Sequence, residues 1–180
     1  MKATGIVRRI DDLGRIVIPK EIRRTLRIRE GDPLEIFTDK DGEVIFKKYS
    51  PIGELGDYAG VYAETLSRTS GHPAIITDKD AVVAVYGVPK KELMDKKISE
   101  TLEKSLEEKK NYMTKPNDPK KVPIVDGIEK YSVSIMIPII SEGDVVGSVV
   151  LLDNDQGGMV GEVESKLATV AAGFLSKNIE

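Results

Sequence analysis

DDLGRIVIPKEIRRTLRIR, at residues 11 to 29, carries the clearest structural signals in this chain of 180 residues. Leu13-Gly14 indicates a tight turn, residues 16 to 18 an apolar strand, and residues 20 to 27 a helix. Pro19 suits the first helical position, because the N–H that proline lacks would have no partner inside the helix. The sequence predicts a turn, a strand and a helix in immediate succession.

The predicted helix has two chemically different sides. Ile22 and Leu26 share one side at 100° per residue, and basic residues fill most of the other. Residues 1 to 29 hold nine Lys and Arg against three acids, a net charge of +6 in a chain whose total is −3. Exposed cations often serve only solvation, but here Glu21 is the one acid on the helix. Because arginine is a planar fork of donors for phosphate and guanine, this charge pattern indicates nucleic-acid binding.

The segment from residue 2 to 50, with LGRIVIPKEIRR at residues 13 to 24 as its core, resembles the DNA-binding domain of the AbrB family of bacterial transition-state regulators. The resemblance implies a swapped-hairpin dimer, in which strands of two chains interleave into one small β-barrel and arginines of both chains face the DNA. Family positions implicated in DNA contact match Arg8, Arg15, Arg23 and Arg24. With the charge pattern, the predicted DNA-binding residues are Arg8, Arg9, Arg15, Lys20, Arg23, Arg24 and Arg27.

The rest of the N-terminal region reads as short strands. Residues 4 to 10 and 15 to 18 flank the turn, and residues 34 to 37 and 43 to 49 form a hairpin around a second turn. A unit of about 50 residues buries too little surface to be secure alone. We therefore expect a homodimer through residues 1 to 50.

Composition changes at Ser50-Pro51-Ile52-Gly53, which reads as a linker. Residues 51 to 180 hold 15 Lys and Arg against 21 acids, a net charge of −6. We expect a basic DNA-binding domain at residues 1 to 53 and a second domain at residues 54 to 180.

Two helices with apolar stripes are predicted as the first and last elements of the second domain, at residues 54 to 70 and 161 to 178. The stripes have heptad-like 4-3-4 spacing, and further apolar residues lie beside them, so we expect a four-helix bundle that joins dimers into a tetramer. The predicted oligomerisation residues are Leu55, Ala59, Tyr62, Leu66, Val163, Leu167, Val170 and Phe174.

Strands and short helices lie between these two helices. The expected elements are strands at 74–77 and 81–86, helices at 88–94 and 98–110, a loop at 114–123, a half-buried strand at 131–139 and its partner at 145–152. This order resembles the GAF domain, a small-molecule sensor fold, and makes the whole chain α+β, with a swapped-hairpin barrel followed by a GAF-like α/β sandwich. The resemblance implies that the first and last helices cover one side of the sheet and that a pocket lies on the other, beneath residues 98 to 123. Two roles of this domain stay open: it binds a ligand of unknown identity, or it serves only to assemble the chains.

Catalytic and metal-binding patterns are missing from the sequence. The chain has no cysteine, and His72 is its one histidine, which reads as a turn residue. Asp153-Asn154-Asp155 starts like a calcium loop but lacks the later oxygen ligands, and residues 157 to 161 lack the spacing of a dinucleotide loop. We expect no enzyme activity, no metal and no cofactor.

The leading hypothesis is a transcription regulator that binds double-stranded DNA at AT-rich promoter regions. The resemblance implies activation and repression of late sporulation genes in the forespore. No apolar run is long enough to span a membrane and no secretory signal is evident, so we expect a cytoplasmic, nucleoid-associated protein. The alternatives are an antitoxin with the same N-terminal fold and a ligand-binding protein whose basic face is incidental.

Overall fold

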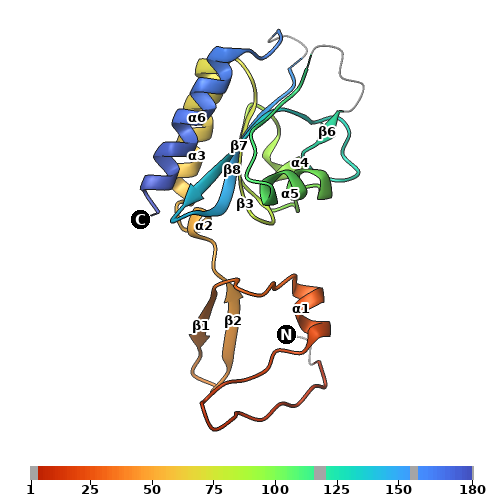
Figure 1. The fold of residues 1–180 in the computed structure, drawn as a ribbon, viewed down its shortest axis with the longest axis vertical. Helices are drawn as coiled ribbons and strands as arrows, with labels where there is room; N and C mark the ends of the chain where they lie inside the picture. Colours follow the sequence, from red (N-terminus) through yellow and green to blue (C-terminus); the bar gives the residue numbers. More distant parts are fainter. Residues whose placement is uncertain (1–3, 116–120, 155–157, 180) are drawn as a thin grey trace. The chain divides into compact units, whose positions relative to one another are not determined.

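A computed structural model describes residues 4–115, 121–154 and 158–179. The chain divides into two compact units, Met1–Tyr49 and Ser50–Glu180, and each is described by itself (Figure 1).

The N-terminal unit contains one helix and one hairpin. Helix α1 (Lys20–Leu26) follows Pro19, and strands β1 (Leu34–Thr38) and β2 (Val44–Lys48) pair antiparallel. Asp39 organises the hairpin turn, because its carboxylate oxygen Oδ1 accepts hydrogen bonds from the N–H groups of Asp41 and Glu43 at 3.0 and 2.9 Å. Helix and hairpin lie where the sequence predicts them.

The two strands expected at residues 4–10 and 15–18 are not formed in the single chain. The backbone there has no regular secondary structure, and of the described residues in this unit only Pro19 is buried. Val7 and Val17 remain 86% and 70% exposed. A strand needs a hydrogen-bonding partner, and in an interleaved dimer that partner comes from the second chain. The described part of this unit therefore exposes apolar side chains and does not bury them in a core of its own.

The C-terminal unit is built on a six-stranded antiparallel sheet. Its strands are β3 (Ala74–Asp78), β4 (Val82–Tyr86), β5 (Tyr112–Met113), β6 (Val122–Pro123), β7 (Ser132–Ser141) and β8 (Asp144–Leu152). They follow the order β4-β3-β8-β7-β5, and β6 pairs with β7. Its helices are α2 (Pro51–Glu54), α3 (Gly56–Ser70), α4 (Lys90–Leu93), α5 (Glu100–Glu107) and α6 (Glu162–Lys177).

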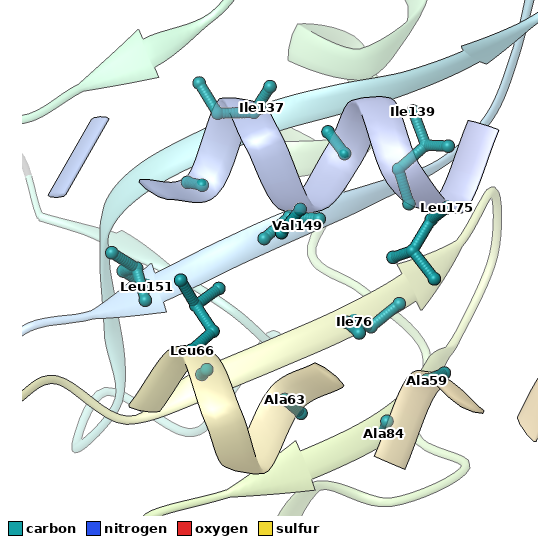
Figure 2. Packing of buried hydrophobic residues seen from close by; sticks show 14 of the residues in the cluster. Ala59, Ala63, Leu66, Ile76, Ala84, Ile137, Ile139, Val149, Leu151 and Leu175 are labelled. Carbon is teal, nitrogen blue, oxygen red and sulfur yellow. The ribbon is translucent and has the colours of Figure 1, made fainter. Parts of the chain in front are cut away.

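Helices cover both faces of this sheet (Figure 1). On one face, α3 and α6 pack against residues such as Ile76, Ile137 and Val149 (Figure 2). On the other face, Leu93 of α4 and Leu102 of α5 belong to a second apolar cluster. The expectation that the first and last helices share one side of the sheet is confirmed.

Two local predictions need correction. Residues 50–53 are not a free linker, because Ser50 caps helix α2 and Ile52 is fully buried in the core beneath α3 and α6. Strand β7 is not half-buried, because Ile135 lies in one apolar cluster and Met136 in the other. The sheet is the middle layer of a sandwich, so both faces of this strand are covered.

Candidate nucleic-acid interface

Asp11 organises the turn that carries Arg15. Its Oδ1 accepts hydrogen bonds from the backbone N–H groups of Leu13 and Arg15 at 3.0 and 2.8 Å. Its Oδ2 accepts one from Nε of Arg15 at 3.0 Å, and a further backbone bond closes the turn from Gly14 N–H to the Asp11 carbonyl. The bond from the Arg15 N–H is the main reason that the pKa of Asp11 lies below its usual value, so the carboxylate stays ionised at neutral pH.

Helix α1 gathers three cations of the site on one side. Lys20, Arg23 and Arg24 fall within an arc of about 100°, opposite Ile22, and Arg27 is the C-terminal cap of the helix. Arg27 ends the helix in the left-handed conformation, with φ of 54°, and the Ile28 N–H donates to the Arg23 carbonyl at 2.8 Å. The cationic face is therefore fixed to the helix and to its C-terminal turn.

A partly buried ion pair ties this helix end to the hairpin. Nζ of Lys48, on β2, donates to the Arg27 carbonyl at 3.0 Å and lies 3.3 Å from Oδ2 of Asp32. Oδ2 of Asp32 also accepts from the Arg29 N–H at 2.8 Å, and its side chain is only 8% exposed. Lys48 is thus a structural cation, and it supports the backbone that presents Arg27.

All seven predicted DNA-binding residues are exposed. Among the described residues, Arg15 is the one member of this set that forms an ion pair, and its partner is Asp11. Arg8 and Arg9 precede the turn and Arg15 follows it. Helix α1 carries Lys20, Arg23 and Arg24, and Arg27 follows as its C-terminal cap.

Sequence reasoning missed Asp11, Asp32 and Lys48 as parts of this site. Asp at the first position of a turn that ends in glycine is a signal for side-chain capping, so Asp11 could have been found. The contact between Lys48 and the Arg27 carbonyl joins residues 21 positions apart and leaves no local pattern.

The predicted oligomerisation residues divide into two groups. Ala59 and Leu66 lie in the core of their own chain, at 0% and 5% exposure, and Leu55 and Leu167 pack against the same cluster. These four side chains contribute to the core of their own chain, and their part in a contact between chains stays a prediction.

The outward side of the same helices keeps apolar surface. Val163 and Val170 on α6 are 65% and 68% exposed, and Val61 on α3 is 64% exposed. Tyr62 stacks on Phe174 with ring centroids 4.6 Å apart, which joins the two helices. We define the α3/α6 patch as the exposed residues Tyr58, Val61, Val163, Val170 and Phe174.

The other sequence-based candidates behave as local structure. His72 is buried after α3, with Nδ1 3.3 Å from the Leu152 carbonyl. Asn154 donates to the Gly71 carbonyl at 2.7 Å, and Asp155 and Gly157 lie outside the described residues. In the described ranges, no group of three or more His, Asp or Glu side chains could hold a metal ion, and no helix is long and apolar enough to cross a membrane.

Comparisons with known proteins divide the chain in a similar way. Residues 54–180 match the family model of "Stage V sporulation protein T C-terminal, transcription factor". Residues 7–53 match the model of "Antidote-toxin recognition MazE, bacterial antitoxin".

Two curated relatives come from Bacillus subtilis (strain 168). Stage V sporulation protein T is 55% identical over 181 residues, covering 100% of this chain and 99% of the relative. The transition state regulatory protein AbrB is 63% identical over 63 residues, covering 32% of this chain and 65% of the relative.

Solved GAF domains share the fold of the C-terminal unit. The GAF domain of a phosphoenolpyruvate-protein phosphotransferase from Coxiella burnetii has a TM-score of 0.54 at 18% identity, covering 69% of this chain and 82% of that domain. The corresponding domain from Acinetobacter has a TM-score of 0.53 at 12% identity, covering 74% and 84%.

A cationic AbrB-like module followed by a GAF-like domain defines a two-domain protein with the α+β class that the sequence predicts. The chain belongs to the family of stage V sporulation protein T.

Proposed function

We propose that this chain is a transcription regulator of sporulation, whose N-terminal module binds double-stranded DNA through its cationic face. The observation that carries the proposal is the set of exposed cations, of which Arg15 alone has an acidic partner among the described residues. Family membership, with a relative 55% identical over its full length, supports the sporulation role. The proposal includes activation and repression of late forespore genes, AT-rich promoter regions and action in the cytoplasm on the nucleoid. It includes no catalysis, metal or cofactor.

The assembly proposed for this function has two levels. The N-terminal modules, at residues 1–49, pair as swapped-hairpin dimers, and the exposure of Val7 and Val17 supports pairing. The GAF-like domains, at residues 50–180, join two dimers into a tetramer through the α3/α6 patch rather than through Leu55, Ala59, Leu66 and Leu167. Two linked DNA-binding modules bind more tightly than one, because the second contact is intramolecular. A ligand of the GAF-like domain would act by changing how this assembly spaces the modules.

Binding of the full-length protein to labelled duplex promoter DNA tests the function. Arg23→Ala with Arg24→Ala should abolish binding at moderate salt, because four cations leave the surface of each dimer. Lys90→Ala with Lys91→Ala is the matched control, since these exposed neighbours lie on helix α4 of the other unit. Equal losses in both variants, or no loss in the first, would refute DNA binding by this face.

An antitoxin is the second candidate, favoured by the match of residues 7–53 to an antitoxin model. A toxin-binding tail is expected to be polar and unpatterned, whereas residues 54–180 here form a packed sandwich. Co-expression with toxins of the host discriminates the two, because only an antitoxin restores growth. DNA binding alone does not discriminate them.

A further inference from the structure

Arg15 is held from two directions by one residue. Asp11 accepts from the Arg15 backbone N–H at 2.8 Å and from its Nε at 3.0 Å, and the Asp11 N–H donates to the Arg15 carbonyl at 3.0 Å. The bond through Nε occupies one edge of the guanidinium, so its two Nη groups stay available for another acceptor. The Arg15 side chain is 67% exposed, which leaves that edge open to solvent.

An acidic residue at position 11 is not expected if this surface binds DNA through net positive charge alone. A carboxylate among DNA-facing arginines repels phosphate, so removal of its charge alone should strengthen binding. Asp12 provides the comparison, because it is adjacent and exposed, carries the same charge and has no hydrogen bond or ion pair in the described structure.

The binding free energy gained by ordering the Arg15 side chain in advance can exceed the repulsion between Asp11 and phosphate. A free arginine side chain populates many rotamers, and fixing one of them at the DNA surface costs entropy. A side chain already held in one orientation loses less freedom on binding, which raises affinity without a new contact. Asp11 holds both the backbone and the guanidinium of Arg15 before DNA arrives.

We propose that Asp11 is a positioning residue for DNA binding, which orients Arg15 so that its Nη groups face phosphate or a base edge. This inference rests on the proposed DNA-binding function. It assigns a favourable role in DNA binding to an acidic residue. It also predicts different effects for Asp11 and Asp12, although the two carry the same charge.

Four full-length variants test the proposal by fluorescence anisotropy with one duplex promoter fragment. Asp11→Asn should bind about fivefold or more weakly than wild type, because Arg15 loses its orientation. Asp12→Asn should bind equally or about twofold more tightly, because it loses only repulsion. In the background of Arg15→Ala, adding Asp11→Asn should change affinity by less than about twofold, because coupled residues do not contribute twice.

The outcomes distinguish a failure of the positioning role of Asp11 from a failure of the proposed DNA-binding function. Asp11→Asn binding as tightly as Asp12→Asn would overturn the positioning role. An equal loss from Asp11→Asn with and without Arg15 would overturn it too, because the effect would then be a general disruption of the turn. Wild-type protein that shows no salt-dependent binding to duplex DNA would instead refute the proposed function. Circular dichroism and sedimentation of each variant verify fold and assembly.

Discussion

Charge placed on the α3/α6 patch should split the proposed tetramer into dimers. Val61 and Val170 are 64% and 68% exposed in the single chain, so a contact between chains can bury about two thirds of each side chain. Complete burial of a valine stabilises by about 1.5 to 3 kcal/mol, so two valines from each of two chains contribute about 4 to 8 kcal/mol. Such a loss weakens association by a factor of about 10³ to 10⁶.

Val61→Glu with Val170→Glu realises this loss and adds the cost of burying carboxylates. Sedimentation equilibrium at micromolar concentration should give a tetramer for wild type and a dimer for the variant. The matched control is Met94→Glu with Met113→Glu, two exposed apolar residues outside both helices, which should stay tetrameric. A variant that remains a tetramer would exclude this patch as the meeting place of the dimers, and a wild-type dimer would exclude the tetramer itself.

Three further predictions concern the separate units. A fragment of residues 1–49 should be a folded dimer that binds DNA more weakly than the full chain, and a monomer in ultracentrifugation would contradict the interleaved fold. Gly147→Ala should destabilise the C-terminal unit by about 3 kcal/mol in urea unfolding, since an added Cβ would collide with a backbone carbonyl of β3, whereas Gly60→Ala in α3 should stabilise it by about 0.5 to 1 kcal/mol. The hydrogen bond that Tyr131 donates to Glu92 at 2.5 Å is the main cause that lowers the pKa of Glu92 below 4.5, so the stability it contributes is present above pH 4.5 and is lost as pH falls through the lowered pKa. Glu92→Gln should therefore reduce the melting temperature more at pH 7 than in acid well below pH 4.5, and an equal reduction under both conditions would refute the ionic contribution.

Local signals predicted much of the fold. The turn at residues 39–42 fixed the first hairpin, and Gly71, with φ of 75°, ends α3 where the sequence indicates. Strands β3, β4, β7 and β8 follow from their runs of apolar residues. The cationic face of α1 was predictable because helical spacing places its cations on one side.

Packing decided what the sequence left open. On α6, both Val163-Val170-Phe174 and Ala168-Ala171-Leu175 form apolar rows, and the pattern alone does not say which row faces the sheet. The alanine-rich row packs inward, since small side chains let the helix approach the strands closely, and the larger side chains stay outside.

Two buried serines are the reason that the sequence predicts only one buried face for strand β7. Ser132 and Ser134 made it read as half-polar, yet both are buried, at 6% and 2% exposure, within a sheet covered on both sides. A hydroxyl can be buried once it has a hydrogen-bonding partner, as the pair of Thr77 and Ser148 shows at 2.7 Å. Polar residues at alternate positions of this strand therefore did not mark a face exposed to solvent.

The salt dependence of DNA affinity is the decisive measurement. For the full-length protein on a duplex promoter fragment, log K should fall against log salt with a slope of about −4 to −7, because the arginines of a dimer release counterions from phosphates. Arg23→Ala with Arg24→Ala should make the slope shallower by about 3 to 4 at salt low enough to measure binding, since four of those contacts are gone. A wild-type slope near zero, or a variant slope equal to that of wild type, would contradict DNA binding through this cationic face.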